Sequence, residues 1–427
     1  MVLTGKQRED MHQAVLEYLT SLGAQFAQSA AAFQQDAGLT PTITMDPNKT
    51  GLLEKKWTSV VRLQRKVMEL ETKIQQLEDD AKLGNVVSRR DVTGASRDAA
   101  LLPRAPPKYS MSGHRSPITC VRFHPVFSVI VTSSEDATIK VWDFETGEFE
   151  RTLKGHTNAV QCVAFNPSGS LLGDPSSSAD LMIKLWDFTS DGSYECKKTL
   201  RGHDHNVCGL TFAPSGDHLF SCSRDTTIKI WEVESGYCIQ TLNGHADWVR
   251  TVCVTDDGQY LASGGNDRSI VLWDLATFKP IQSMREHEHV VETIAFARQA
   301  QHATIDTIHG KKVLETTGQS GAGVRYLLSG SRDRTVRLWE AFSGLQLMNF
   351  VSHDNWVRSV RFHWTGKYAI SASEDKTIRL FDMETGRCVR TLKDAHNHFL
   401  TSLDVHPSLP LLVTGSIDKM INVWECM

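Results

Sequence analysis

Apolar residues recur along this chain with different periods in different regions, and the first region has a helical period. Within residues 6–39, Val15, Leu19 and Leu22 follow one another at steps of three and four, which predicts an amphipathic helix. A second, alanine-rich helix is predicted at about 26–36. Two short helices bury little apolar surface alone. We therefore expect this region to dimerise through residues such as Val15 and Leu19.

The second region, residues 52–82, has a heptad period. One apolar position is usually branched and the other is leucine, with Lys56 as the one exception. This composition favours a parallel, two-stranded coiled coil. The first position holds Leu53, Val60, Val67 and Ile74, and the second holds Leu63, Leu70 and Leu77. The alternative is one amphipathic helix packed on the chain's own domain.

Residues 83–112 lose all periodicity. They are polar, charged and proline-bearing, as in SRRDVTGASRDAALLPRAPPK, which is typical of a flexible linker.

From Gly113 to residue 427 one pattern recurs, with histidines mostly 42 or 43 residues apart. Each histidine is followed by an aspartate, with an aromatic residue six positions later and a hydroxyl residue four positions earlier. The histidines are His114, His156, His203, His245, His287, His353 and His396. The aspartates are Asp136, Asp180, Asp225, Asp267, Asp333, Asp375 and Asp418. The hydroxyls are Thr132, Ser176, Ser221, Ser263, Ser329, Ser371 and Thr414, and the aromatics are Trp142, Trp186, Trp231, Trp273, Trp339, Phe381 and Trp424.

Most repeats have a Gly-His pair near their start and a Trp-Asp or Trp-Glu pair near their end. Together with the period, these pairs predict an all-β, seven-bladed WD-repeat β-propeller. The repeats begin near residues 113, 155, 202, 244, 286, 352 and 395. The chain ends at INVWECM, the third strand of the last blade. Its outer strand is therefore expected near residues 108–111, where it would close the ring and cover exposed strand edges.

The four repeated residue types predict a hydrogen-bonded path in each blade, from the indole through the hydroxyl and the imidazole to the carboxylate. A Ser-His-Asp set also suggests a hydrolase. Seven equivalent sets cannot be seven active sites, and no GxSxG motif accompanies them, so we expect no catalytic residues. Second histidines at His205, His289 and His398 have metal-ligand spacing, but we expect them to be surface residues and expect no metal site.

Two blades depart from the pattern. Blade 2 has 24 residues between His156 and Asp180 instead of 22, so Pro175 and the extra residues are expected to interrupt a strand and form a bulge. Blade 5 has an excess at about 298–323, rich in Gly, Thr, Gln and His, which we expect to be a surface loop.

Composition narrows the class of protein. The net charge of −4 argues against nucleic-acid binding by the chain as a whole. No apolar signal region opens the chain, and no run of 18 apolar residues predicts a membrane span. The nine cysteines lack any CxxC pair and are expected to be reduced core thiols of a cytosolic protein that needs no cofactor.

Large and basic residues lie beside the histidine and aspartate turns of blades 3 to 6, which share one end of the propeller. The candidate partner-binding residues, here called the basic-aromatic rim, are Arg224, Trp248, Arg250, Arg332, Trp356, Arg358 and Lys376. Arg268 and Arg334 are basic at matching positions, whereas blades 1 and 2 carry Glu135, Ala137, Ala179 and Leu181 there. Trp and Arg dominate binding hot spots, and a basic rim favours an acidic partner. The alternative for any single arginine is a solvated charge or a weak ion pair.

The order of these regions resembles the lissencephaly-1 / nuclear distribution protein F family over nearly the full length. The resemblance rests on GLLEKKWTSVVRLQRKVMELE, GHRSPITCVRFHPVFSVIVTSSEDATIKVWD, GHDHNV, REHEHVVE, HDNWVRSV and VTGSIDKMINVWEC. The first helical region resembles a LisH dimerisation motif.

The resemblance implies a non-catalytic, homodimeric regulator of cytoplasmic dynein that binds the motor domain of the dynein heavy chain. It also implies NudE-type coiled-coil adaptors as partners, and roles in nuclear migration, centrosome positioning, spindle orientation and minus-end-directed transport. The expected location is the cytoplasm, on the microtubule cytoskeleton and at the centrosome or spindle pole. By resemblance, motor contacts fall on Arg224, Arg250, Arg332, Trp356 and Lys376. Trp248 and Arg358 rest on rim position alone.

Two alternatives stay open. One is a general WD-repeat scaffold, such as the substrate-recruiting propeller of a ubiquitin ligase. The other is a regulatory subunit of a platelet-activating-factor acetylhydrolase.

Overall fold

The computed structural model describes residues 102–426 apart from 176–180, 189–193 and 318–324. The helical region at 6–39, the coiled coil at 52–82 and residues 83–101 of the linker lie outside the described residues. Within the described part of the chain, no helix combines the length and the apolar composition needed to cross a membrane.

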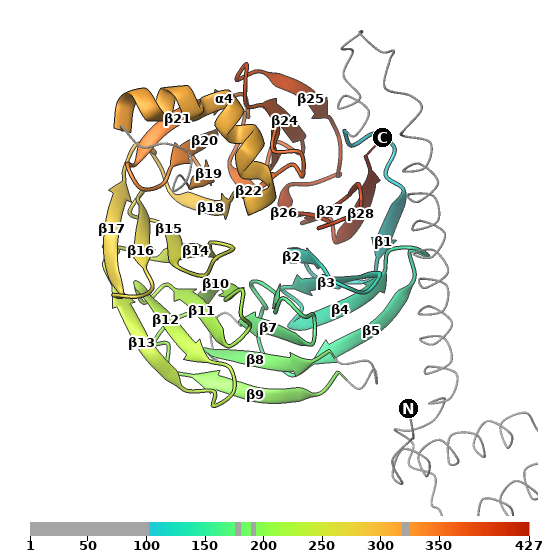
Figure 1. The fold of residues 1–427 in the computed structure, drawn as a ribbon. Helices are drawn as coiled ribbons and strands as arrows, with labels where there is room; N and C mark the ends of the chain where they lie inside the picture. The colour runs from blue at the N-terminus through green and yellow to red at the C-terminus, as the bar shows by residue number, and fades with distance from the viewer. Residues whose placement is uncertain (1–101, 176–180, 189–193, 318–324, 427) are drawn as a thin grey trace, which may run out of the picture. The chain divides into compact units, whose positions relative to one another are not determined.

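Seven four-stranded antiparallel sheets surround a central axis, which confirms the predicted seven-bladed propeller (Figure 1). Blade 1 consists of β2 (Ile118–Phe123), β3 (Val129–Ser134), β4 (Thr138–Asp143) and β5 (Phe149–Lys154). Blade 2 consists of β6 (Ala164–Phe165), β7 (Leu171–Pro175), β8 (Met182–Asp187) and β9 (Cys196–Arg201). Blade 3 consists of β10 (Val207–Phe212), β11 (His218–Ser223), β12 (Thr227–Glu232) and β13 (Cys238–Asn243). Blade 4 consists of β14 (Val249–Val254), β15 (Tyr260–Gly265), β16 (Ile270–Asp274) and β17 (Lys279–Met284). Blade 5 consists of β18 (Val291–Phe296), β19 (Tyr326–Ser331), β20 (Thr335–Glu340) and β21 (Leu345–Val351). Blade 6 consists of β22 (Val357–Phe362), β23 (Tyr368–Ser373), β24 (Ile378–Asp382) and β25 (Cys388–Leu392). Blade 7 is β26 (Leu400–Val405), β27 (Leu411–Ser416), β28 (Met420–Glu425) and β1 (Tyr109–Ser112).

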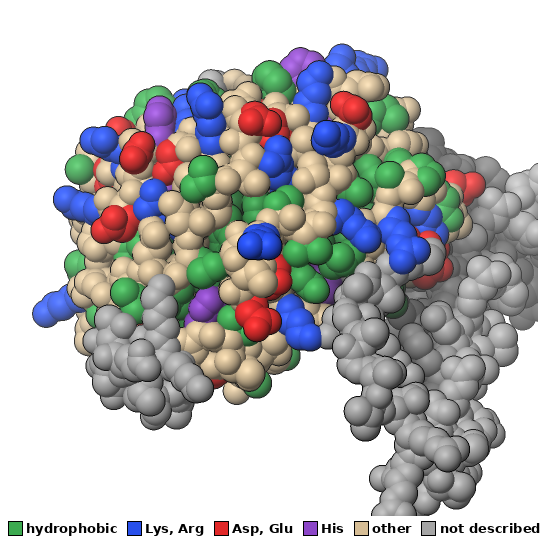
Figure 2. Space-filling view, turned by 90° about the horizontal axis from the view of Figure 1, so that it is seen from above, with side chains coloured by type: hydrophobic (Ala, Val, Ile, Leu, Met, Phe, Trp, Pro, Cys, Tyr) green, Lys and Arg blue, Asp and Glu red, His purple; other side chains and the backbone are tan. Residues whose placement is uncertain are grey.

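The core lies between blades. The second strands are buried on both faces, as the wholly buried β3, β19 and β27 show. Inner strands of neighbouring blades lie side by side around the axis. The outer strands are mostly exposed or half-buried, as in β5 and β13, which each bury a single leucine. Figure 2 shows one side of the propeller, where basic and acidic side chains are interspersed.

The outer strand of blade 7 comes from the start of the described chain. β1 pairs antiparallel with β28, from Tyr109 opposite Val423 to Ser112 opposite Met420. The two strands lie together at the C-terminus in Figure 1. Leu102 is 2% exposed and packs in the core cluster that contains Trp424. β1 is the strand expected near residues 108–111. The segment 102–107 is also packed on the blade, so the expectation of a flexible linker is wrong for these residues.

The excess in blade 5 is a helix, so the expectation of a surface loop is wrong. Helix α4 (Gln299–Thr317) crosses one face of the propeller near β18 and β22 (Figure 1). Ile305 is 0% exposed and joins the core cluster of blades 5 and 6. The Nε2 of Gln301 donates to the carbonyl of His363 at 2.9 Å, and the hydroxyl of Tyr326 donates to Asp306 at 2.6 Å. These tertiary contacts stabilise a helix that lacks a pronounced apolar face.

Blade 2 departs from the others in a different way from that expected. β7 runs in unbroken register against β8 as far as Pro175, opposite Ile183, so no bulge interrupts the strand before its end. Ser176 and Asp180 lie outside the described residues. The inner strand β6 has only two residues, whereas the inner strands of the other six blades have six. The irregularity therefore falls on the inner strand.

The cysteines are free, as expected, but not all are core residues. Cys120, Cys222 and Cys426 are buried, whereas Cys196 and Cys238 are exposed on outer strands. The expectation of nine core thiols is wrong for these two.

Candidate functional site

The repeated side chains form the expected hydrogen-bonded path in six blades. Histidine Nδ1 lies 2.6–3.1 Å from the blade aspartate, and histidine Nε2 lies 2.6–2.8 Å from the hydroxyl, in blades 1 and 3 to 7. The indole N–H donates to that hydroxyl at 2.8–2.9 Å in the five of these blades that have tryptophan. Because a carboxylate only accepts, Nδ1 carries the proton and Nε2 accepts from the hydroxyl.

The path shifts the acidity of its members. Burial lowers the pKa of His287 more than Asp333 raises it. Burial raises the pKa of Asp333, but the hydrogen bond and charge of His287 and the hydrogen bonds of Thr335 outweigh it, so the pKa lies well below its usual range. A buried neutral imidazole that donates to a carboxylate has a structural role. It is not part of a catalytic triad, since no group within the path is free to act as a nucleophile.

Blade 2 replaces the hydroxyl by a carboxyl group. Asp174 lies opposite Lys184, the register that Thr132 and Lys140 share in blade 1, so Ser176 is not the equivalent hydroxyl residue. Asp174 is 0% exposed, and its Oδ1 lies 3.1 Å from Nε2 of His156. The indole Nε1 of Trp186 is buried without a hydrogen-bond partner. This blade therefore has an incomplete path.

The blade paths place two turns of each blade at one end of the propeller. In blades 1 and 3 to 7 the backbone N–H after the histidine also donates to the blade aspartate, as Ala246 does to Asp267 at 3.0 Å. The residue after each aspartate has a left-handed backbone, for example Arg268 at φ 65° and Lys376 at φ 66°. The turns that carry the basic-aromatic rim are thus held in a defined geometry by buried groups.

One half of the basic-aromatic rim stacks around Trp248. The guanidinium of Arg224 lies 4.6 Å from the Trp248 ring centroid, and that of Arg250 lies 5.5 Å from it. The Nε of Arg250 donates to the side chain of Asn266 at 2.8 Å. Two arginines on one indole form cation–π contacts of roughly 0.5–2 kcal/mol each. This cluster joins blades 3 and 4.

The other half repeats the arrangement around Trp356, between blades 5 and 6. The guanidinium of Arg332 lies 4.2 Å from the Trp356 ring centroid, and that of Arg358 lies 5.7 Å from it. The Nε of Arg358 also donates to Glu374 at 2.7 Å. Each tryptophan is half-buried and presents part of its ring to solvent. The structure thus brings six of the seven predicted rim residues into two Arg-Trp-Arg clusters.

Glu292 connects the two arginines of the second cluster. Its carboxylate oxygens lie 2.5 Å from Arg332 and 3.1 Å from Arg358, and its side chain is 7% exposed. Burial raises the pKa of Glu292, but the charges of Arg358, Arg250 and Arg332 outweigh it and lower the pKa below its usual range. A carboxylate that stays charged here holds the guanidiniums in place while leaving their ring-stacked faces on the rim.

The remaining candidates stand apart from these clusters. Lys376 is half-exposed in the turn between β23 and β24, and Arg268 and Arg334 are exposed in the equivalent turns. The second histidines, His205, His289 and His398, are exposed. Across the described ranges, no group of three or more His, Cys, Asp and Glu side chains is arranged to hold a metal ion.

Comparisons with known proteins agree with this architecture. Seven segments match the family described as WD domain, G-beta repeat, at residues 105–143, 147–187, 194–232, 236–274, 310–340, 344–382 and 386–425. Residues 5–42 match the PAC1 LisH domain. The chain is 42% identical to "Nuclear distribution protein PAC1" of Gibberella zeae over 95% of this chain and 89% of the relative. It is 41% identical to "Nuclear distribution protein nudF 1" of Talaromyces marneffei over 98% of this chain and 91% of the relative. The chain belongs to the PAC1/nudF family of nuclear distribution proteins.

The WD-repeat matches and the names of these relatives indicate a regulatory scaffold family rather than a family of enzymes. The blade paths fit that class, because each is committed to hydrogen bonds within its own blade. The residues of this PAC1/nudF chain that are available to a partner are therefore those on the surface of the propeller.

Sequence reasoning missed Glu292 and Glu374 as parts of the rim. Glu292 occupies the fifth position after its blade histidine, where blades 4 and 6 carry Arg250 and Arg358. Glu374 occupies the position before its blade aspartate, where blade 5 carries Arg332. Comparing equivalent positions of neighbouring repeats for opposite charges would have found both.

Proposed function

We propose that this chain is a non-catalytic regulator of cytoplasmic dynein that binds the motor domain through the basic-aromatic rim and acts as a homodimer. The proposal includes nuclear distribution as its cellular role, as the names of the relatives say of them. It also includes NudE-type adaptors as partners and a cytoplasmic, microtubule-associated location. The observation that carries the proposal is the pair of Arg-Trp-Arg clusters on one end of the ring.

The clusters have the properties of a protein-binding hot spot. Stacking on the indoles, together with the carboxylates of Glu292 and Glu374, restricts the arginine side chains before any partner arrives. Less conformational entropy is therefore lost on binding. The rim residues carry five positive charges, and the two carboxylates that hold them, Glu292 and Glu374, carry two negative charges. The two clusters with Lys376 are therefore net positive, which suits an acidic partner surface.

Binding of purified full-length chain to a purified dynein motor domain tests the rim. Trp356→Ala removes the ring that stacks two arginines, and Arg332→Ala removes the guanidinium closest to it. Each substitution is expected to weaken binding at least about 30-fold, as for a hot-spot residue that contributes 2 kcal/mol or more. Raising the salt concentration is expected to weaken the wild-type complex further.

A matched control separates the rim from the rest of the ring. Lys376 in blade 6 and Lys419 in blade 7 follow their blade aspartates with the same left-handed backbone, at φ 66° and 68°. Lys376→Ala is expected to weaken motor binding, whereas Lys419→Ala is expected to leave it unchanged. Wild-type binding by a folded variant that carries both Arg332→Ala and Trp356→Ala would exclude the rim as the docking surface. Co-purification with ubiquitin-ligase subunits or a serine esterase instead of dynein would favour the alternative scaffold functions.

The dimer is proposed to form through residues 6–39 and 52–82. Replacing Val67 and Leu70 by aspartate puts charges at both heptad positions and is expected to convert the dimer to a monomer in sedimentation experiments. A chain that stays dimeric with both substitutions would exclude the coiled coil as the main interface.

A further inference from the structure

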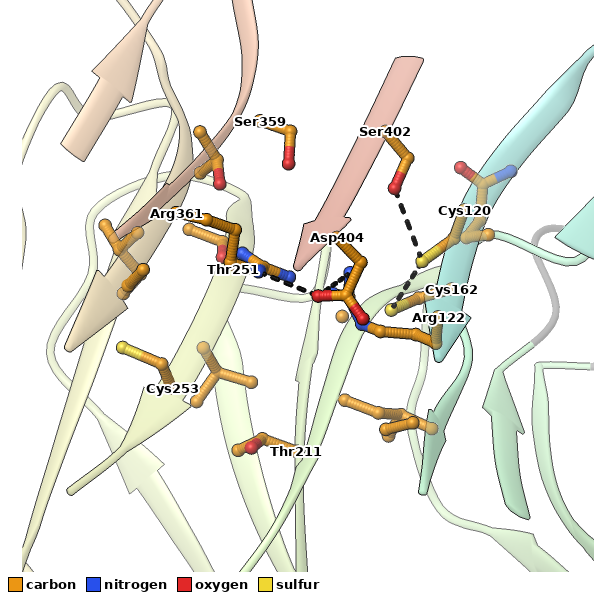
Figure 3. A pocket seen from close by; sticks show the side chains of 18 of the residues that line it. Cys120, Arg122, Cys162, Thr211, Thr251, Cys253, Ser359, Arg361, Ser402 and Asp404 are labelled. Atoms are coloured by element: carbon orange, nitrogen blue, oxygen red, sulfur yellow. Dashed lines mark hydrogen bonds and ion pairs between the residues drawn. The ribbon is translucent and has the colours of Figure 1, made fainter. Parts of the chain in front are cut away.

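Two cysteines from neighbouring blades meet in the wall of the central channel. The sixth residue after each blade histidine is small and lies on the inner segment of its blade. These seven residues are Cys120, Cys162, Gly209, Thr251, Thr293, Ser359 and Ser402. Only blades 1 and 2, which are adjacent, carry cysteine there, and the two sulfur atoms lie 3.9 Å apart (Figure 3). A disulfide needs about 2.05 Å between the sulfurs, so closing the pair requires a shift of roughly 2 Å.

The backbone around Cys162 can supply this shift. In the other blades the equivalent residue lies within a six-residue inner strand, as Cys120 does in β2. In blade 2 the inner strand is reduced to Ala164–Phe165, and Cys162 precedes it without a ladder partner on β7. The preceding Gln161 donates its N–H to the carbonyl of Pro175 in β7 at 3.1 Å, whereas Cys162 itself has no ladder partner there and can shift without breaking a ladder hydrogen bond.

The pair is open to small molecules and lies in a positive field. Cys120 and Cys162 both line a cavity of about 630 Å³ on the propeller axis. Arg122 and Arg361 line the same cavity, and the carboxylate of Asp404 lies between them, 3.8 Å from Arg122 and 3.1 Å from Arg361 (Figure 3). The described lining as a whole has five arginines and four carboxylates. The hydrogen bond from Cys162 lowers the pKa of Cys120, and the charge of Arg122 adds to this against the opposing effect of burial.

We propose that Cys120 and Cys162 form a reactive dithiol that a peroxide converts into a disulfide between blades 1 and 2. The thiolate of Cys120 attacks one peroxide oxygen and breaks the O–O bond, which gives a sulfenic acid and, for hydrogen peroxide, one water after protonation. The sulfur of Cys162 then attacks the sulfenic sulfur, the S–S bond forms, and a second water leaves with the thiol proton. Two thiols lose two electrons in all, and one peroxide molecule accepts them.

The bond would act where the ring is least regular. It would join the inner segment of blade 2, which has the shortest inner strand and the incomplete path at Trp186, to the regular inner strand of blade 1. The oxidised chain is therefore expected to unfold at a higher temperature than the reduced chain.

Thiol counting and peptide mapping on the full-length chain test the proposal. Two exposed cysteines, Cys196 and Cys238, are first replaced by serine, so that bonds between chains do not contribute. Treatment of this background with hydrogen peroxide is expected to remove two of its seven remaining thiols, from the nine of the natural chain. Mass spectrometry without reduction should find the Cys120 and Cys162 peptides joined and lighter by two hydrogens, and a reductant should restore both thiols.

In the same background, Cys120→Ser and Cys162→Ser are each expected to prevent the loss of two thiols on treatment with hydrogen peroxide. Cys222→Ser serves as the matched control, because this buried cysteine lies outside the cavity and its loss should leave the bond unchanged. The proposal is overturned if the folded background chain keeps seven thiols, if the new bond joins another pair, or if Cys120 is carried on to sulfinic acid. The decisive peptide mapping uses chain in which both cysteines are present, so it does not depend on whether either serine variant folds.

Discussion

Replacing Asp174 by threonine is expected to stabilise the propeller, because it restores the hydroxyl that the other blades carry at this position. In blade 1 the equivalent Thr132 accepts from the indole of Trp142 at 2.9 Å and lies 2.8 Å from Nε2 of its histidine. In blade 2 a carboxyl group with no exposure occupies the place, and the indole of Trp186 has no acceptor. Threonine is close to aspartate in volume and favours strands, so the β7 ladder is retained.

The size of the effect follows from the groups that change. A buried N–H without a partner costs about 1–3 kcal/mol, and the threonine hydroxyl would satisfy that of Trp186. The contact between Asp174 and His156 is replaced rather than lost, because a threonine hydroxyl can donate to Nε2 of His156 as that of Thr132 does to His114. A net gain of about 1–3 kcal/mol corresponds to a rise in Tm of about 2–5 °C for a domain of roughly 300 residues.

Calorimetry at several scan rates measures the shift and separates equilibrium from kinetic effects. A double-mutant cycle with Trp186→Phe isolates the new hydrogen bond. Trp186→Phe is expected to cost little in the natural chain and about 1 kcal/mol more in the presence of Asp174→Thr. The reciprocal change, Thr132→Asp in blade 1, should lower Tm.

Two results would refute this reasoning. One is a Tm that falls or stays constant with Asp174→Thr while Thr132→Asp destabilises. The other is a Trp186→Phe cost that is the same in both backgrounds, because the hydroxyl would then have made no bond to the indole.

Three further predictions concern other parts of the ring. Folding lowers the pKa of His287 and of aspartates such as Asp225, so the unfolded chain binds more protons in acid. The urea midpoint should therefore decline below about pH 6.5 and fall steeply below about pH 4, and a midpoint that rises with acid would contradict this. Ile305→Ala should lower the free energy of unfolding by denaturant by about 2–5 kcal/mol, and an unchanged midpoint would mean that α4 is not part of the core. Motor binding should not change, because α4 follows the end of β18 that lies away from the rim. Deleting residues 104–112 should lower Tm for the whole propeller, since β28 loses its outer partner, and a chain that begins at Gly113 and melts like the longer chain would exclude this role for β1.

Much of the rim could be predicted from sequence because it depends on local repetition. The position of each turn follows from the histidine and aspartate that fix it, so residues next to them, such as Trp356 and Arg332, are placed on one end by their repeat position. The ring-closing strand follows from the same count, because the seventh repeat supplies three strands and its four-stranded sheet takes the fourth from β1. These predictions require only short-range order and the closure of a ring.

The errors arise where a contact depends on which residues the ring brings together. The segment of α4 lacks a strong apolar face and contains Gly310, so its composition suggested a loop, and only packing of Ile305 and the bond to His363 make it a helix. Spacing from Asp180 suggested Ser176 as the blade 2 hydroxyl, whereas strand register places Asp174 there.

The sequence by itself determined the seven blades, the hydrogen-bonded paths of six of them and the end of the ring that carries the basic and aromatic residues, because each is a pattern within one repeat. The tertiary structure alone decided the contacts across blade boundaries. Glu292 lies between two arginines of neighbouring turns, and Cys120 meets Cys162 across two inner segments. Such distances depend on the register and tilt of separate sheets around a closed ring, which no single repeat specifies.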